Sequence, residues 1–589
     1  MKNRVFLALA AAVPAIAWGQ ANNVYVQQNL VSDVPGMAVT TDPNLVNPWG
    51  ISQTASSPFW VSNHDKGNTT VYNGAGAITN LVVAIPSAKG TGTGVPTGQI
   101  TGNGANFPLP APNGKAASFM FATEDGTIAA WNSGAASTAV TVVNNSASGA
   151  VYKGIASNPT GTPMIYAANF SSGNIDVFDE NFNPTTVSGG FKDPNLPSGF
   201  GPFNIWNLGG KLYVAYAKVG SDKIHDVAGA GNGFVDVFDT NGNLLQRVVS
   251  NGPLNSPWGV AIAPANWGAF GGALLVGNFG DGTINAFNLS TGATLGALQD
   301  STGKAIVNTG LWGIIFGNGK TADTNTLYIT ANIAPGGVSH GLLAAIAPPS
   351  QVTSIENAAS LNAGSGTIAP GEIVVLKGFT IGPIPLAANA VPATGTLGSS
   401  VAAGGGTSVT FNGTAAPILY ASASATSVIV PYELAGSSTA NVVVTHNGAP
   451  TAAFSATMAA TAPGLFTFNE SGTGEVVAFN SDTTLNSSTN AATRGTPVLL
   501  YATGEGQTDP PGTDGTIIGE FVRVPVAAVS LTIGGAPATV VYAGSAPGDV
   551  AGVMEIEAIV PQNSTTGAAQ VVLTVGSASS PTGSTLFVQ

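Results

Sequence analysis

The chain of 589 residues contains no cysteine. Disulfide bonds, thiolate nucleophiles and cysteine metal ligands are therefore excluded. Charged residues are also scarce, since Asp, Glu, Lys and Arg make up only 8% of the chain, against about a quarter in ordinary soluble proteins. We expect the surface to consist largely of Asn, Ser, Thr, Gly and Gln, and the fold to be stabilised by its apolar cores.

Basic residues are the scarcest charged group. The chain has 16 Lys and Arg against 29 Asp and Glu, which gives a net charge of −13. Nucleic-acid binding needs clustered basic side chains, so it is excluded as a function class. The same imbalance argues against an anionic membrane surface.

A long apolar run is found only at the N-terminus, in "MKNRVFLALAAAVPAIAWGQA". Lys2 and Arg4 precede an apolar core, and small residues surround a cleavage point near Gln20 or Ala21. This pattern is typical of a secretory signal peptide, which we place at residues 1–21. No later segment is apolar enough to span a bilayer. We expect a secreted or cell-surface protein without a transmembrane anchor.

Glycine and proline are abundant, with 78 and 38 residues, and long helical periodicity is missing after the N-terminus. Both features favour many short strands joined by turns. The stretch "LLVGNFGDGTINAFN" (274–288) has relatives in "FWVSNHDKGNTTVYN" (59–73) and "IYAANFSSGNIDVFD" (165–179). A phosphate-binding loop would not recur in this way with its glycines lost, so we interpret "GNFGDGT" as a hairpin turn.

Each copy of this hairpin follows a short apolar segment such as "NPWGI", "YKGIA", "GPFNI", "SPWGVAI" or "GLWGIIF". One repeat then contains four short strands and recurs about every 50 residues, the period of propeller blades. We predict a β-propeller over residues 22–351 with six blades, seven being the alternative count. The strand at residues 24–32 is expected to close the ring beside the last blade, because closure removes exposed edges. An open sandwich of the same strands is the rival interpretation.

A different repeat begins near residue 352. "FNGTAAPILYASASATSVIVPYELAG" (411–436) resembles "IGGAPATVVYAGSAPGDVAGVMEIEAIVP" (533–561), with Tyr420 matching Tyr542. Alternating Val, Thr and Ala between Gly, Pro and Asn turns is typical of β-sandwiches. We predict two immunoglobulin-like modules, residues 352–462 and 463–589, and so an all-β chain throughout.

Two family resemblances follow from these motifs. "NLVNPWGI" and "FMFATEDGTIAAWN" resemble an uncharacterised family of secreted bacterial β-propeller proteins, some of which carry PEP-CTERM sorting tails, and the repeats are similar to NHL-type blades. "ENAAS", "IAPGEIVVLKG", "VIVPYELAG" and "YATGEGQTDPPGTDG" resemble an immunoglobulin-like C-terminal domain family that is common in secreted acidobacterial proteins. These resemblances imply a bacterial, exported protein and carry no activity with them.

The candidate binding residues lie in the recurring propeller turns: Asn63, His64, Glu124, Asp125, Asn169, Asn278 and Asn332. Propeller hydrolases of the lactonase kind hold a divalent ion on the axis with Glu, Asn and Asp, so a divalent ion such as calcium would suit this set. Asn at the end of a strand also caps turns by bonding to the backbone, and an Asn on every blade fits a scaffold better. We predict neither catalytic residues nor a cofactor.

Other signals are weaker. His64, His225 and His340 lie in propeller loops, where solvated loop histidines are the preferred interpretation and a shared site at one channel mouth is the alternative. "FDTNGNLL" (238–245) faintly resembles a calcium loop but is better explained as a hairpin turn. Trp49, Trp258 and Trp312 recur in register, which favours core packing over stacking on sugars.

The sequence therefore favours an exported scaffold that binds an extracellular ligand, such as a glycan or a surface protein. The alternative is a metal-dependent hydrolase or lyase with a site on the propeller axis.

Overall fold

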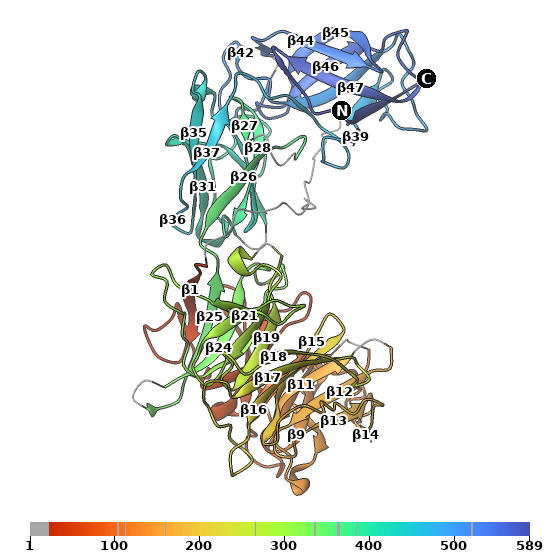
Figure 1. Ribbon diagram of the computed structural model, residues 1–589. Coiled ribbons are helices and arrows are strands. Elements are labelled where there is room, and N and C mark those ends of the chain that lie inside the picture. Colours follow the sequence, from red (N-terminus) through yellow and green to blue (C-terminus); the bar gives the residue numbers. More distant parts are fainter. Residues whose placement is uncertain are drawn as a thin grey trace. The chain divides into compact units, whose positions relative to one another are not determined.

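The computed structural model describes residues 23–102, 105–111, 113–158, 161–265, 267–334, 337–361, 366–383, 386–519 and 522–589. The expected signal peptide, residues 1–21, lies outside the described residues. The described chain forms two compact units that divide after Pro348, and each contains several β-sheets (Figure 1). Within the described residues the regular structure is β-strand together with short 3-10 helices, which confirms the all-β prediction.

The N-terminal unit contains five four-stranded antiparallel sheets in chain order. The first sheet has β3 (Pro48–Ser52), β4 (Phe59–Asn63), β5 (Asn68–Tyr72) and β6 (Ile78–Ala84). The second has β7 (Pro96–Thr101), β8 (Phe119–Thr123), β9 (Thr127–Trp131) and β10 (Val140–Asn144). The third has β11 (Tyr152–Asn158), β12 (Met164–Asn169), β13 (Asn174–Asp179) and β14 (Pro184–Thr185). The fourth has β15 (Phe200–Leu208), β16 (Lys211–Lys218), β17 (Gly233–Phe238) and β18 (Leu244–Ser250). The fifth has β19 (Pro257–Ile262), β20 (Leu274–Asn278), β21 (Ile284–Phe287) and β22 (Thr294–Ala297).

The sixth sheet combines the two ends of this unit. It contains β23 (Leu311–Phe316), β24 (Leu327–Ile333), β25 (His340–Ala347), β1 (Val26–Ser32) and β2 (Thr40–Thr41). Strand β1 pairs antiparallel with β25 from Val26 opposite Ala347 to Ser32 opposite Leu342. The segment near the start of the chain therefore supplies a strand that residues 311–347 lack. Short 3-10 helices lie in the loops at η1 (His64–Lys66), η2 (Ser133–Ala135), η3 (Ser146–Ser148) and η4 (Gly268–Phe270).

The glycine-rich stretch around residue 280 is a hairpin turn, as the sequence predicts. Strands β20 and β21 pair antiparallel, with Gly277 opposite Ile284, and the turn lies between them. Gly282 has a φ of +73°, which an L side chain rarely adopts. The calcium-loop resemblance at 238–245 is likewise a turn, because Asp239 Oδ1 accepts the backbone N–H groups of Asn241 and Asn243 at 2.9 Å.

The first strands of the six sheets contact one another in cyclic order, mostly through glycine. A Cβ on each glycine would meet atoms of the next sheet: Gly50 meets Thr97, Gly98 meets Gly154, Gly154 meets Asn204, Gly259 meets Trp312 and Gly313 meets Trp49. In the fourth sheet Asn204 takes this position, and its Nδ2 donates to the carbonyl of Trp258 at 3.0 Å. Since the series returns to its first member, the sheets form a closed, β-propeller-like ring.

The C-terminal unit begins with two facing sheets. One contains β26 (Gln351–Asn357), β28 (Ile373–Phe379), β34 (Ala425–Ile429), β33 (Ile418–Ala421) and β29 (Ala387–Ala388). The other contains β27 (Thr367–Ile368), β37 (Phe454–Met458), β35 (Thr439–His446), β31 (Thr407–Phe411), β30 (Ser400–Val401), β32 (Thr414–Ala415) and β36 (Ala449–Pro450). Alternating residues of both sheets, such as Leu376 and Val442, share one buried core. The short helices η6 (Ala403–Gly405) and η7 (Tyr432–Leu434) complete this first C-terminal module.

The second C-terminal module is built on one ten-stranded sheet rather than two separate sheets. It contains β38 (Gly464–Leu465), β41 (Pro497–Thr503), β46 (Met554–Ile559), β45 (Ala536–Ser545), β44 (Val529–Ile533), β47 (Gly567–Val575), β49 (Ser584–Val588), β39 (Gly474–Glu475), β40 (Ala478–Asn480) and β48 (Ala578–Ser579). Strand β45 is long enough to pair with β44 at one end and β46 at the other, so the two halves stay joined around a common core. The strands β42 (Thr508–Asp509) and β43 (Val524–Pro525) pair separately.

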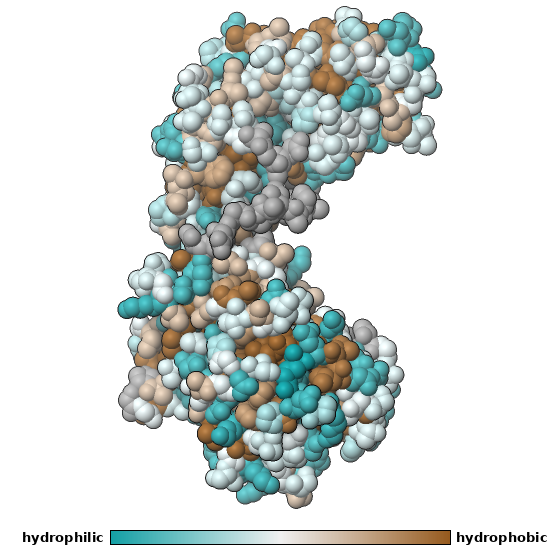
Figure 2. Space-filling model, in the orientation of Figure 1, coloured by the Kyte–Doolittle hydropathy of each residue, from teal (hydrophilic) through white to brown (hydrophobic). Residues whose placement is uncertain are grey.

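The surface reflects the shortage of charge. Figure 2 shows a face on which pale, weakly polar residues predominate between separate hydrophilic and hydrophobic patches. Among the described residues, the structure contains no helix of the length and hydropathy needed to cross a bilayer.

The close approach of the first strands predicts the effect of adding one methyl group. In Gly259→Ala the new Cβ would lie 2.5 Å from the carbonyl oxygen of Trp312. This is a backbone atom, which cannot rotate away as the end of a flexible side chain can. We expect the N-terminal unit to lose about 2–3 kcal/mol of unfolding free energy, measured by denaturant titration. In the control Gly229→Ala, the new Cβ meets the end of the Asn232 side chain, which can rotate. Equal stability of the two variants would contradict this account of the ring.

Candidate functional site

The centre of the ring is filled by one side chain from the first strand of each sheet. These residues are Trp49, Thr97, Lys153, Phe203, Trp258 and Trp312. Each is at most 4% exposed, so the axis is closed at this level. In five of the six sheets the residue precedes the glycine that allows the next sheet to approach, and in the fourth it precedes Asn204.

Aromatic rings make up most of this plug. Trp49 and Trp312 stack with their ring centroids 3.4 Å apart, and Trp258 meets both edge-on. Phe279, from the turn after β20, also stacks on Trp312, with ring centroids 4.0 Å apart. These tryptophans are buried within the protein, which confirms the prediction that they serve core packing.

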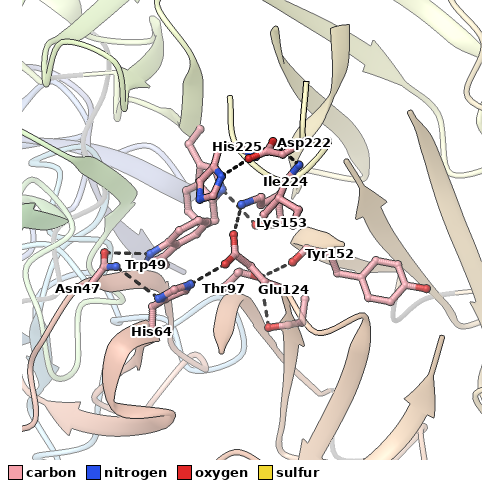
Figure 3. Close-up of polar contacts among 12 residues, drawn as sticks. Asn47, Trp49, His64, Thr97, Glu124, Tyr152, Lys153, Asp222, Ile224 and His225 are labelled. Atoms are coloured by element: carbon pink, nitrogen blue, oxygen red, sulfur yellow. Dashed lines mark hydrogen bonds and ion pairs between the residues drawn. The ribbon is translucent and has the colours of Figure 1, made fainter. Parts of the chain in front are cut away.

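A charged group adjoins the aromatic plug (Figure 3). The carboxylate of Glu124, in the turn between β8 and β9, accepts from Lys153 Nζ through Oε1 and from His64 Nε2 through Oε2 at 2.9 Å. Lys153 Nζ also lies 5.1 Å above the Trp49 ring, within range of a cation–π contact. The three side chains come from the first three sheets, so the ion pairs tie those sheets together.

The network continues from His64 into the aromatic plug. His64 Nδ1 lies 2.6 Å from Asp65 Oδ1, and that oxygen also accepts from Asn47 Nδ2 at 2.9 Å. Asn47 Oδ1 in turn accepts the indole N–H groups of Trp49 at 3.0 Å and Trp312 at 3.3 Å. The ring of His64 stacks on Trp49 with centroids 4.9 Å apart. Both ring nitrogens of His64 and both carboxylate oxygens of Glu124 are thus engaged by protein partners.

The electrostatics keep the charged forms in place. Burial raises the pKa of Glu124, but the hydrogen bond from His64 and the charge of Lys153 outweigh it and hold the pKa at about 2. Burial also opposes the charged form of His64, yet its bonds to Asp65 and Glu124 raise the pKa above the usual value. At neutral pH the group therefore carries an ionised Glu124, and His64 gains protonation relative to a free imidazole.

Local structure explains how these side chains are held. His64 opens the short helix η1, which ends at Gly67 with a φ of +61°. A Cβ on Gly67 would lie 2.4 Å from Thr93 Cβ, so the loop between β6 and β7 packs directly on this turn. Asp125 points away from the group, and its carboxylate accepts the backbone N–H groups of Ala88 and Val95 at 3.2 and 3.3 Å.

The recurring asparagines form hydrogen bonds within their own hairpins or to neighbouring loops. Asn63 Nδ2 donates to Asn68 Oδ1 and Thr70 Oγ1 at 2.8 and 2.9 Å. Asn169 Nδ2 donates to Asp176 at 2.9 Å, and Asn278 Oδ1 accepts from the backbone of Asn255 at 3.0 Å. Asn332 Nδ2 lies 3.5 Å from Ser339 Oγ. These contacts link strand ends to neighbouring loops, as the scaffold interpretation of the asparagines requires.

The histidines have separate environments. The interpretation of His64 as a solvated loop residue is wrong, because its side chain is 15% exposed and lies between two carboxylates. His225 is solvated, with a side chain 75% exposed beside Asp222. His340 pairs with Asp33 at 2.7 Å. The three histidines therefore have different carboxylate partners: Asp65 and Glu124 for His64, Asp222 for His225 and Asp33 for His340.

The residues at the axis do not fit a metal ion. Both oxygens of Glu124 are engaged by cations, and Asp125 is engaged by the backbone. Within the described ranges, no three or more His, Asp or Glu side chains are grouped as metal ligands. The donor set that the sequence suggested is thus dispersed.

Sequence reasoning missed Lys153 and Asn47. Lys153 stands in "YKGIA" at the position where four other copies have Trp or Phe. A basic residue in register with buried aromatic residues signals a buried charge and therefore a partner carboxylate. Asn47 precedes "PWG" with a φ of +48°, a backbone conformation that only the structure reveals.

The ion pairs predict a large loss of stability when Glu124 is neutralised. Glu124→Gln leaves Lys153, whose side chain is 3% exposed, without its carboxylate. We expect unfolding of the N-terminal unit at pH 7 to require about 3 kcal/mol less, measured by denaturant titration. Glu124→Gln/Lys153→Met should recover much of that loss, since no buried charge remains unpaired. Glu180→Gln, at an exposed carboxylate, is the matched control, and a loss equal to the Glu124→Gln loss would refute the assignment.

The low pKa of Glu124 also predicts that the N-terminal unit loses folding stability in acid. Because folding lowers this pKa to about 2, its contribution is complete above pH 5 and disappears as the pH falls towards 2. The integrated loss is roughly 3 kcal/mol, because folding lowers the pKa of Glu124 from 4.5 to about 2. His64 acts in the opposite direction, since its raised pKa gives stability that disappears as the pH rises through that pKa. Thermal unfolding measured from pH 2 to 8 should show this loss of stability at low pH in the native protein and in Glu180→Gln. The loss should be smaller in Glu124→Gln.

Several solved structures are similar to this chain at low identity. They include the streptogramin B lyase structure, which is 11% identical, covers 54% of this chain and 97% of that chain, and has a TM-score of 0.33. The PQQ-bound aldose sugar dehydrogenase from Streptomyces coelicolor is 13% identical and covers 55% and 99%, with a TM-score of 0.32. Values this low support no inference about activity.

Comparison of sequences gives closer relatives. No protein-family model matches the chain. The uncharacterized protein R648 of Acanthamoeba polyphaga mimivirus is 33% identical over 315 residues, which are 52% of this chain and 76% of that protein. The uncharacterized protein L690 of the same virus is 33% identical over 305 residues, which are 48% of this chain and 77% of that protein. The chain therefore belongs to the family of the mimivirus proteins R648 and L690.

Proposed function

We propose that this chain is an exported binding protein in which a six-bladed propeller presents a ligand-binding rim. Two immunoglobulin-like modules then act as spacer or attachment modules. The six sheets that meet in cyclic order support the blade count. The facing sheets of the first C-terminal module and the joined halves of the second support the module assignment. The apolar N-terminal run and the motifs that resemble secreted bacterial families support export.

The observation that carries this proposal is that the oxygens of Glu124 and the ring nitrogens of His64 are already bonded to other protein groups. Glu124 has a pKa of about 2, so it is a poor general base near neutral pH. Its two oxygens are bonded to Lys153 and His64, and the second nitrogen of His64 is bonded to Asp65. A reactive acid or base would need at least one atom directed at substrate. The group instead holds together the sheets around it.

The rim beside this group carries the features of a binding surface. The insertion between β16 and β17 begins at Val219, which packs against the aromatic plug. It then exposes Ile224 and Val227, at 40% and 41%, beside the solvated pair of Asp222 and His225. Apolar side chains exposed next to polar ones, on a loop anchored to a rigid ring, are suited to recognition. An extracellular glycan or surface protein is the partner class that we propose.

One observation favours a second candidate, a lyase or hydrolase that uses His64. The side chains of His64 and Glu124 remain 15% and 17% exposed, and the pKa of His64 is raised. A small rearrangement that released His64 from Asp65 would provide a general acid at the mouth of the ring.

The two candidates are separated by testing binding and turnover with the same protein, residues 23–589. We expect binding in an array of glycans and bacterial surface fractions that Ile224→Asp weakens at least tenfold. Leu245→Asp, at a residue 52% exposed on the outer strand β18, should leave binding unchanged. We expect no turnover of lactones, esters or glycosides. Turnover near 1–1,000 per second that His64→Gln abolishes would replace the binding proposal with the enzymatic one.

A further inference from the structure

The two C-terminal modules meet at a packed junction inside one compact unit. Ile373 N donates to Thr503 Oγ1 at 2.9 Å, and Gln507 Nε2 donates to the carbonyl of Tyr432 at 2.6 Å. A Cβ on Gly552 would lie 2.3 Å from the carbonyl oxygen of Gly371. The apolar part of the junction combines residues of both modules: Ile373, Val375, Ile429, Ile517 and Val550. The contact is therefore close and largely dry.

Carboxyl groups of like charge face each other across this junction. Glu372 of the first module and Glu505 of the second are 0% and 2% exposed, and the charge of Glu505 adds to the burial that raises the pKa of Glu372. Glu433 of the first module lies close enough to Asp514 of the second to raise the pKa of the Asp514 carboxyl. Asp514 Oδ1 also accepts the backbone N–H of Tyr432 at 2.9 Å. Each pair thus takes one member from each module.

Positive charge does not compensate the buried pair. Among the described residues, the ion pairs involve neither Glu372 nor Glu505. Glu372 accepts from Asn357 Nδ2 at 2.8 Å and from the backbone N–H of Ala369 at 2.6 Å. Glu505 Oε2 is buried without a hydrogen-bond partner. Ionising both groups would leave two unpaired negative charges in a dry contact, which is costly unless the modules move apart.

We propose that this junction is a pH-dependent latch, in which the modules dock rigidly while these carboxyls hold protons and loosen when the carboxyls ionise. The latch needs no added ligand, because the proton is the switching species. It gives the C-terminal unit a rigid arrangement in acid and a hinged one in alkali. The relevant groups are Glu372 and Glu505 at the centre and Asp514 at the margin.

The directions of the pKa shifts agree with this geometry. Burial raises the pKa of Glu505 to about 7 and that of Glu372 well above its usual value. Burial and Glu433 raise the pKa of Asp514 to about 6. A carboxyl whose pKa is raised by docking stabilises the docked state below its ordinary pKa, near 4. That stabilisation is lost as the pH rises through the docked value, so the latch opens between about pH 5 and 8.

The other titratable groups facing the junction do not cancel this effect. Tyr432 is buried between the two pairs, and burial raises its pKa beyond the range in which the carboxyls titrate. Arg523 lies near Tyr432 and lowers the pKa of that tyrosine, while its Nε donates to the carbonyl of Pro511 at 3.1 Å. Lys377 of the first module and Glu470 of the second also act on each other, and burial lowers the pKa of Lys377 and raises that of Glu470. Glu505 and Asp514 are the groups whose raised pKa values fall between pH 5 and 8.

Fluorescence energy transfer between the two modules tests the latch in the full chain. Since the chain contains no cysteine, Ser455→Cys and Ser577→Cys provide one exposed labelling site in each module. With EDTA present, we expect the transfer efficiency to change with a midpoint near pH 7. In Glu372→Gln/Glu505→Gln the efficiency should stay at its acidic value, because each amide resembles the protonated carboxyl.

Controls make the result specific to the junction. Glu356→Gln removes a buried carboxyl of the first module, whose pKa is also raised and which lies near Lys377, and it should keep the full transition. The single variant Glu505→Gln retains the shape of the side chain and should reduce the pH-dependent change in transfer efficiency. It replaces the double variant if that variant does not fold. Calorimetry should show the C-terminal unit of the unlabelled native chain losing thermal stability from pH 5 to 8. A constant efficiency in the native chain, or an unchanged transition in the glutamine variants, would overturn the proposal.

Discussion

The close approach of six first strands around one axis is the constraint on which the N-terminal unit depends. Glycine at five of the six positions lets each strand contact the next, and Asn204 supplies a hydrogen bond at the sixth. The residue just before each of these positions is then buried at the axis and fills it. Four of those residues are aromatic, and their stacking replaces what would otherwise be an open channel.

The charged group at the axis follows from that constraint. Lys153 occupies a position where most copies have an aromatic ring, so its charge is buried and needs a carboxylate within reach. Glu124 provides it from the neighbouring sheet, and His64, Asp65 and Asn47 satisfy the atoms that remain. The network thus ties together the first three sheets at the centre of the ring, in a chain with only 8% charged residues.

The two units handle buried carboxylates in opposite ways. At the axis, opposite charges meet, and the pKa of Glu124 is held low. At the C-terminal junction, like charges meet without a basic partner, and the carboxyl pKa values of Glu372, Glu505 and Asp514 are raised. The first arrangement resists changes of pH near neutrality. The second responds to them, because a carboxyl at a contact between modules can be relieved by movement, whereas one at the centre of a closed ring cannot.

The sequence by itself determined the all-β class, the repeated hairpins and the burial of the tryptophans. These properties depend on local patterns: glycine in turns, alternation along strands and apolar residues in register. Only the tertiary structure decided which side chains meet. His64 and Glu124 are 60 residues apart, and their contact with Lys153 depends on the order in which the sheets close. The joined sheet of the second C-terminal module and the carboxyl pairs at the junction were likewise beyond sequence reasoning, because long-range pairing and burial are set by the packing of distant strands rather than by local pattern.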